Sequence, residues 1–151
     1  MTRILIVEDT SSLREELELV LQLQGYEVDA AANGQEGLDR ALESPPDLIV
    51  SDVMMPVMDG FEMAERLQDD SRTSGIPFLY LTARATREDM RKGMTLGADD
   101  YLTKPFTSEE FLSAIEAVVR RRERIEKRID ARSTQQRDAT DELTVALGGR
   151  R

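Results

Sequence analysis

The sequence predicts an α/β fold: a doubly wound, five-stranded parallel sheet with five helices, the last of them extended into a stalk. Two observations lead to this prediction. Short runs such as Ile4–Val7 and Leu48–Val50 are apolar on both faces, which is typical of parallel strands covered by helices on both sides. Helical patterns of about 10–15 residues separate these runs, which favours βαβ units with right-handed crossovers.

Five segments are the predicted strands. In three of them, Ile4–Val7, Leu48–Val50 and Ile76–Leu81, apolar residues dominate the whole run. Two weaker candidates have more polar residues, and these are Glu27–Ala31 and Asp99–Leu102. A chain of 151 residues is long enough for one such domain with a real core and a short extension.

Five helices are predicted between and after these strands. The first has an apolar stripe, a capping-box spacing from Ser12 to Glu15, and Gly25 as its end signal. Three further helical patterns follow at residues 34–43, 59–69 and 86–95. The fifth helix begins near Thr107, where Thr107 and Glu110 have the spacing of a second capping box.

The fifth helix is longer than a small sheet can cover. It is predicted to reach about residue 130, and its apolar residues follow a heptad seam, which favours a parallel homodimer. Residues 133–142 are polar and are either frayed helix or linker. We expect a domain over residues 1–120, a stalk over 121–140 and a tail over 141–151. The seam consists of Phe111, Ile115, Val118, Arg122, Ile125 and Ile129.

Composition narrows the classes of function. The chain has no Cys, His or Trp, so it has no disulfide framework and no thiolate zinc site. No apolar run approaches the roughly 20 residues of a membrane span, and no signal-peptide pattern opens the chain. Residues 120–151 hold ten Lys or Arg and six Asp or Glu, a net +4, which leaves −14 for residues 1–119. We therefore expect a cytoplasmic protein without nucleic-acid or membrane partners.

Charged and hydroxyl side chains follow the predicted strands where each strand ends. Glu8 and Asp9 come after the first strand, Asp52 after the third, Thr82 after the fourth and Lys104 after the fifth. The carboxyl ends of parallel strands meet at one edge, where such sheets bind their ligands. Carboxylates gathered there favour Mg²⁺, and a carboxylate can also accept a phosphoryl group as an acyl phosphate. With no histidine on this chain, the phosphoryl donor is expected on a partner.

At these residues the sequence resembles the response-regulator receiver domain of two-component signalling. The resemblance covers about residues 2–120 and includes Met55-Pro56, Asp59-Gly60 and Thr82-Ala83 as well as the charged residues above. It implies a flavodoxin-like fold with strand order 2-1-3-4-5. It also implies a cis bond between Lys104 and Pro105, and a sensor histidine kinase or phosphotransfer protein as the partner.

The resemblance implies a role for each site residue. Asp52 is expected to accept the phosphoryl group, and Thr82 and Lys104 to contact it. Tyr101 matches an aromatic switch that turns inward when the threonine moves. The Mg²⁺ ligands would be Asp9, Asp52 and the backbone carbonyl of Met54, with Glu8 acting through water; no other cofactor is expected.

Two departures from the family pattern are present. Glu8 stands where Asp is commoner, which lengthens the reach to the metal. Met54 occupies a position that tunes self-dephosphorylation, and its apolar side chain cannot orient a water molecule. The chain is therefore expected to phosphorylate itself with Mg²⁺, to lose the phosphoryl group slowly, and to have no catalytic output domain of its own.

The sequence indicates less clearly how the chain passes its signal on. Residues 141–151 are similar to the opening of diguanylate cyclase catalytic domains, so one alternative is the regulatory half of a receiver–diguanylate cyclase. A disordered end is the other interpretation of this tail. A phosphatase with an aspartate nucleophile is rejected, because Met54 stands where its general acid would be. A purely structural coiled-coil module would leave the acidic residues unexplained.

Overall fold

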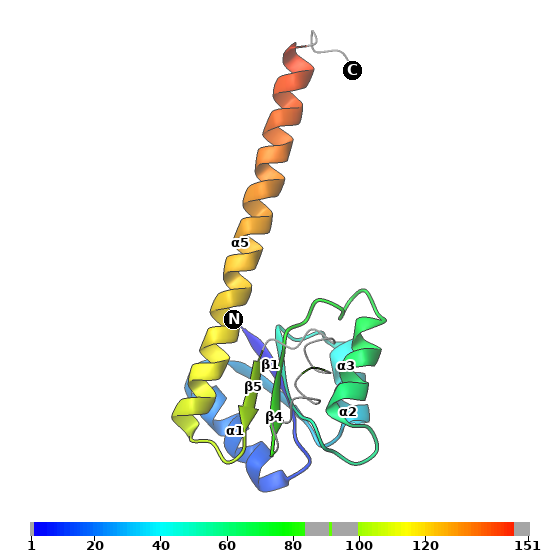
Figure 1. Cartoon of the computed structure of the whole chain (residues 1–151), viewed down its shortest axis with the longest axis vertical. Helices are drawn as coiled ribbons and strands as arrows, with labels where there is room; N and C mark the ends of the chain where they lie inside the picture. The colour runs from blue at the N-terminus through cyan, green and yellow to red at the C-terminus, as the bar shows by residue number, and fades with distance from the viewer. Residues whose placement is uncertain (1, 84–90, 92–99, 147–151) are drawn as a thin grey trace. The chain divides into compact units, whose positions relative to one another are not determined.

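A computed structural model describes residues 2–83, 91 and 100–146, with side chains described as far as residue 128. Its five strands are parallel and form one sheet in the order β2-β1-β3-β4-β5 (Figure 1). The predicted α/β, flavodoxin-like fold and its strand order are confirmed. The strands are β1 (Arg3–Val7), β2 (Glu27–Ala31), β3 (Leu48–Asp52), β4 (Phe78–Thr82) and β5 (Asp100–Thr103).

Several strand boundaries differ from the predicted ones: β1 begins at Arg3, β3 ends at Asp52 and β4 ends at Thr82. β4 begins at Phe78 rather than at Ile76, because Pro77 has no N–H to donate to a neighbouring strand. The Pro77 carbonyl still accepts a hydrogen bond from the Ile49 N–H. β5 ends at Thr103, one residue later than predicted. Asp99, its predicted first residue, lies outside the described part of the chain.

The described helices are α1 (Ser11–Leu23), α2 (Gly34–Glu43), α3 (Gly60–Gln68) and α5 (Ser108–Ala146). Of the helix predicted at residues 86–95, the structure describes only residue 91, which is helical. α5 continues past its predicted end near residue 130, and residues 133–142 are helical in it rather than a linker. None of the helices searched in the described chain has the length and apolarity required to cross a membrane.

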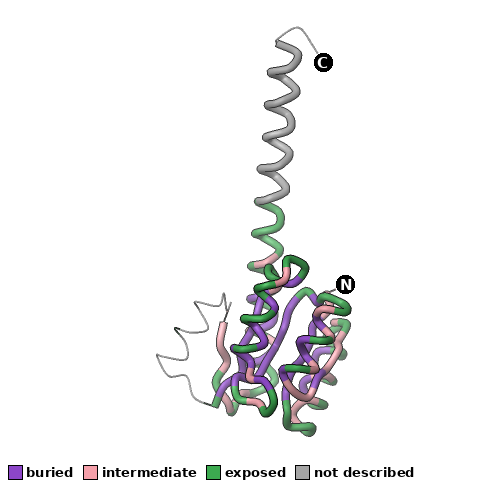
Figure 2. The backbone as a smooth tube through the Cα atoms, turned by 90° about the vertical axis from the view of Figure 1, so that its right-hand side faces the viewer, coloured by how far each residue is buried: buried purple, intermediate pink, exposed green. Residues whose placement is uncertain are grey.

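The core occupies both faces of the sheet, because successive strand residues point to opposite sides. On one face Leu5, Ile49 and Tyr80 join a buried cluster with α2 and α3. The helices α1 and the first turns of α5 lie on the other side (Figure 1). Figure 2 shows the strands and the inner faces of the helices as buried. The helical residues buried with α1 and α5 are Leu17, Leu21, Phe111, Ile115 and Val118.

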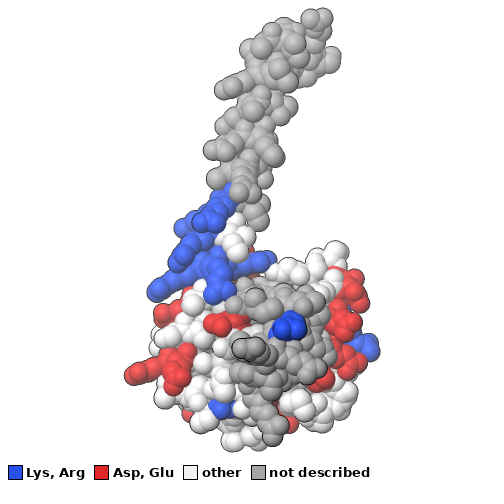
Figure 3. Space-filling model, in the orientation of Figure 1, with Lys and Arg blue, Asp and Glu red and all other residues white. Residues whose placement is uncertain are grey.

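The chain divides into two compact units, Met1–Val118 and Val119–Arg151. In the first, acidic side chains are spread over the visible surface (Figure 3). In the second, Lys and Arg side chains gather along the described turns of α5. Arg122 and Glu126 form an i,i+4 ion pair there, with 3.9 Å between Nε and Oε1.

Candidate functional site

Three carboxylates meet at the carboxyl ends of β1 and β3. These strands are neighbours in the sheet, and Val7 is paired with Ser51, so Glu8 and Asp52 emerge side by side. One carboxylate oxygen from each of Glu8, Asp9 and Asp52 lies within 4.8 Å of the others. Glu8 is fully buried and Asp52 is 7% exposed, whereas Asp9 is exposed. The acids predicted to gather at this edge are therefore close together.

Lys104 connects two of these acids. Its Nζ lies 2.9 Å from Asp52 Oδ2 and 3.3 Å from each carboxylate oxygen of Glu8. The backbone N–H of Lys104 donates to the Thr82 carbonyl at 2.8 Å, which fixes the end of β5 against β4. The Lys104–Pro105 peptide bond is cis, as the resemblance implied.

Burial and charge set the protonation behaviour of this cluster. The pKa of Glu8 is raised from 4.5 to about 7. Burial is the largest cause, and the negative charge of Asp52 and a hydrogen bond with it add to the rise, while Lys104 lowers this pKa. Burial would lower the pKa of Lys104, but hydrogen bonding to Asp52 and the charges of both acids outweigh it, so that pKa is raised. The lysine therefore stays charged beside the acids.

Thr82 and Tyr101 occupy different parts of the fold. Thr82 is the last residue of β4 and is buried; the preceding residue, Leu81, is paired with Asp52 on β3. Thr82 is thus at the same sheet edge as the acids. Tyr101 lies earlier on β5, half-buried, with its ring 5.5 Å from the ring of Tyr80 in the core on the α2–α3 face. The structure places Tyr101 next to this aromatic cluster.

The loop after Asp52 is held close to β3 by two features of α3. Asp59 is the N-cap of α3, and its carboxylate accepts a 2.8 Å hydrogen bond from the Glu62 N–H. A Cβ atom at Gly60 would collide with the carbonyl oxygen of Asp52, so only glycine allows this approach. Met54 lies in the loop between β3 and α3 and is 77% exposed.

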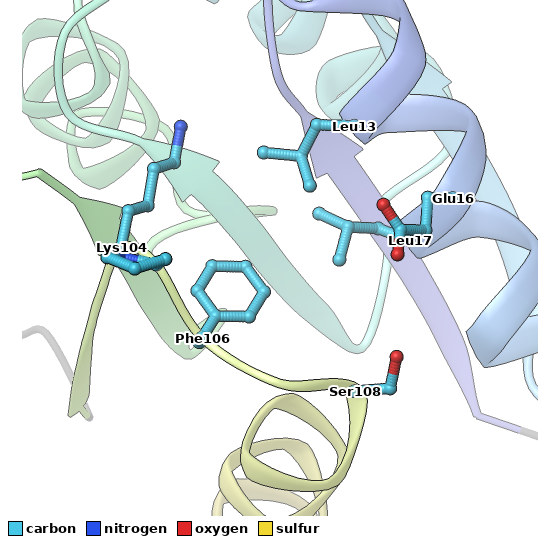
Figure 4. Close-up of a pocket in the computed structure, with 7 residues that line it drawn as sticks. Leu13, Glu16, Leu17, Lys104, Phe106 and Ser108 are labelled. Atoms are coloured by element: carbon cyan, nitrogen blue, oxygen red, sulfur yellow. The ribbon is translucent and has the colours of Figure 1, made fainter.

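A pocket of about 280 Å³ lies between α1 and the segment after β5 (Figure 4). The aliphatic stem of Lys104 forms part of its wall, while the Nζ of the same residue contacts Glu8 and Asp52. Lys104 therefore separates a mostly apolar pocket from the acidic cluster. The lining residues are Leu13, Glu16, Leu17, Lys104, Pro105, Phe106 and Ser108.

One residue beside the site escaped the sequence analysis. Arg14, on α1, donates from Nη1 to the backbone carbonyl of Glu8 at 2.8 Å. The only sequence signal was a basic residue near the start of α1, five and six positions after two acids that precede the helix. The contact depends on where α1 lies relative to the end of β1, which the local sequence does not specify.

The donor set suits a hard divalent cation. Three carboxylates offer only oxygen ligands, which Mg²⁺ prefers, and their mutual repulsion favours a cation between them. The raised pKa of Glu8 is a sign of that repulsion, since the charge of Asp52 is one of its causes. The residues present therefore fit Mg²⁺.

Comparison with known proteins places these residues in a family context. Residues 4–116 match the response regulator receiver domain family. The chain is 44% identical over 125 residues to the DNA-binding dual master transcriptional regulator RpaA of Synechocystis sp., covering 83% of this chain and 52% of RpaA. It is 43% identical over 121 residues to the response regulator ArlR of Staphylococcus aureus, covering 80% of this chain and 54% of ArlR. The chain thus spans about half the length of these relatives.

Solved structures agree with the sequence comparison. The chemotaxis response regulator CheY4 of Vibrio cholerae is similar with a TM-score of 0.75 and 39% identity, covering 78% of this chain and 98% of CheY4. The non-phosphorylated HemR receiver domain of Leptospira biflexa is similar with a TM-score of 0.73 and 35% identity, covering 79% and 94% of the two chains.

Proposed function

This chain belongs to the response regulator receiver domain family, and on that premise we propose that Asp52 accepts a phosphoryl group from a partner histidine kinase or phosphotransfer protein. The observation that carries the proposal is the contact of Lys104 Nζ with both Asp52 and Glu8 beside the third acid, Asp9. A nucleophilic carboxylate, an ammonium group and a cation-binding acid set are what phosphoryl transfer to an aspartate requires.

In the proposed reaction an Asp52 carboxylate oxygen bonds to phosphorus while the phosphorus–nitrogen bond to the donor imidazole breaks. The bonding electrons leave with the imidazole, and Asp52 becomes an acyl phosphate. Lys104 would pair with a phosphoryl oxygen, and the Thr82 hydroxyl would donate to another. Glu8, Asp9, Asp52 and the backbone carbonyl of Met54 would hold Mg²⁺, which would supply positive charge against the phosphoryl oxygens.

The assignment of Asp52 is tested by labelling with a radioactive small-molecule phosphoryl donor and Mg²⁺. The wild-type chain should take up label, and Asp52→Asn should take up none, because an amide is not nucleophilic enough to accept the group. Asp39→Asn serves as the matched control, since that carboxylate is exposed on α2 and outside the site. Label that survives in Asp52→Asn at the wild-type level would refute the assignment.

The phosphoryl group on Asp52 is expected to be long-lived. The exposed side chain of Met54 offers no polar atom that could hold an attacking water beside the acyl phosphate. Met54→Gln should therefore shorten the lifetime of the purified phospho-protein, measured by loss of label after the donor is removed. Leu23→Gln, the same kind of change at an exposed position on α1, should not. A wild-type lifetime of only seconds would contradict this explanation.

Signal output is proposed to pass through the β5 edge, where Tyr101 lies, and through α5, by formation of a homodimer. The tail resemblance keeps a receiver–diguanylate cyclase as an alternative. The name of RpaA makes a DNA-binding output a second candidate for the full-length protein. Sequencing the reading frame beyond Arg151 distinguishes these outputs. A purely structural coiled-coil module does not account for the family match over residues 4–116.

A further inference from the structure

Arg14 holds the loop that carries two of the three acids. Its Nη1 donates to the Glu8 carbonyl at 2.8 Å, and its backbone N–H donates to the Thr10 carbonyl at 2.9 Å. The N–H of Glu8 is bound from the other side by the Ala31 carbonyl, at 3.0 Å at the end of β2. The backbone at Glu8 is thus fixed at its N–H by β2 and at its carbonyl by Arg14.

This contact constrains Asp9 in particular. The Glu8 carbonyl and the Asp9 N–H belong to one planar peptide unit, so a hydrogen bond to the carbonyl fixes the plane from which Asp9 extends. Burial confines the side chains of Glu8 and Asp52, but that of Asp9 is exposed. The backbone is therefore the main constraint on where the Asp9 carboxylate lies.

The hydrogen bond from Arg14 would favour metal binding, whereas its charge would oppose it. The guanidinium carries a positive charge, and here it is held at the residue that precedes Asp9. A positive charge at this place repels a divalent cation. Removal of Arg14 would therefore tighten metal binding if its charge dominated, and would weaken binding if its hydrogen bond dominated.

We propose that Arg14 is a positioning residue that increases the affinity of the site for a divalent cation by fixing the Glu8–Asp9 peptide. The inference rests on the proposed function, because it assumes that the acids bind Mg²⁺. The guanidinium does not touch the metal or the phosphoryl group; it acts through the backbone of the loop. Its loss allows the peptide to rotate, so the acids must be ordered again when the cation binds.

The test is the Mg²⁺ dissociation constant, measured by isothermal titration calorimetry on the full chain. Arg14→Met keeps the aliphatic stem but removes the hydrogen bond and the charge, and should weaken binding by about three- to tenfold, as expected for one lost hydrogen bond. Arg66→Met is the matched control. Arg66 forms an exposed i,i+4 pair with Glu62 on α3, and its loss should leave the dissociation constant unchanged.

A purely structural role would have a different signature. It would lower the melting temperature of the metal-free protein in Arg14→Met without changing the dissociation constant, so both quantities are measured. If Arg14→Met does not fold, Arg14→Lys takes its place and is judged by the same criterion, since a lysine lacks the planar fork of donors. Binding by the variant as tight as that of the wild type, or tighter, would overturn the proposal.

The same titration separates this inference from the proposed function. If the wild type binds Mg²⁺ and the Arg14 variant binds it equally well, the positioning role is wrong and the proposed function stands. If the wild type itself binds no Mg²⁺, the metal part of the proposed function fails, and the positioning role fails with it.

Discussion

The properties of Glu8 depend strongly on its surroundings. Its side chain is fully buried, yet it lies beside Asp52 and contacts Lys104. Burial and the neighbouring acid both disfavour its charged form, which raises its pKa from 4.5 to about 7. A glutamate on the surface would show none of this, so the shift reports the environment of the site.

The raised pKa of Glu8 predicts how stability depends on pH in the absence of divalent cations. Between about pH 4.5 and 7 the folded chain keeps a proton that the unfolded chain has released, so the free energy of unfolding falls as pH rises. Glu8→Gln cannot ionise and should lack this loss. Across that window its free energy of unfolding should rise relative to that of the wild type by on the order of 1–3 kcal/mol.

Urea denaturation at a series of pH values, with a chelator present, measures this difference. Glu43→Gln is the control, because Glu43 is exposed at the end of α2 and should follow the wild-type curve. Parallel curves for Glu8→Gln and the wild type would contradict the explanation based on burial.

At the scale of an element, two similar sequence patterns had different outcomes. Thr107 and Glu110 form the predicted capping box: the Glu110 N–H donates to Thr107 Oγ1 at 3.1 Å, and the Thr107 N–H donates to Glu110 Oε1 at 3.3 Å. The capping box predicted at Ser12 is wrong. α1 already begins at Ser11, its N-cap is Thr10, and no side chain caps it. Ser12 therefore lies inside the helix.

These two sites give a matched pair of substitutions. Thr107→Ala should lower the free energy of unfolding by about 1 kcal/mol, because the N-cap hydrogen bond is lost. Ser12→Ala should change it by less than about 0.5 kcal/mol, since alanine is the better helix former inside a helix. Chemical denaturation of both variants provides the comparison. An equal loss of unfolding free energy in the two variants would argue that the capping box at Thr107 contributes nothing to stability.

The heptad seam of α5 divides into two parts with different environments. Phe111, Ile115 and Val118 are fully buried within the first unit, so they belong to its core and are not available to a second chain. Among the described side chains, Arg122 and Ile125 continue the seam, and Ile125 is 38% exposed. The surface available for pairing therefore starts later along the helix than the sequence pattern indicated.

At the scale of the whole molecule, the proposed homodimer is tested by light scattering with and without beryllofluoride, which imitates the phosphoryl group. The mass should rise toward that of a dimer when the site is loaded, because a ligand can shift such an equilibrium by binding one state better. Ile125→Lys should prevent the rise, since it places a charge in the seam. A monomer at high concentration in both conditions would remove the proposal.

Glu123→Lys is the control for that experiment. It also places a lysine on α5 and changes the charge by two units, against one for Ile125→Lys, but residue 123 lies off the heptad seam, so it should leave dimer formation intact. Loss of the dimer in both variants would point to general charge repulsion along this basic segment rather than to the seam.

The sequence by itself determined the strands, the residues that follow them and the family. Apolar runs such as Leu48–Val50 are local signals, and parallel strands necessarily gather their carboxyl ends at one edge. Gly25 also ended α1 as predicted, with a φ of 90°. Where local signals compete, as at Ser12, or where a pattern continues past the core, as in α5, the predicted boundaries were wrong.

Only the tertiary structure decided which of the acids is buried and what each one contacts. Lys104 reaches Glu8 across 96 positions of sequence, and Arg14 reaches the carbonyl of the same residue from α1. Glu8 and Asp9 are adjacent in sequence, yet one is buried and the other exposed. Such differences arise because burial and side-chain contacts depend on segments that are distant in sequence and packed together, and no local pattern encodes them.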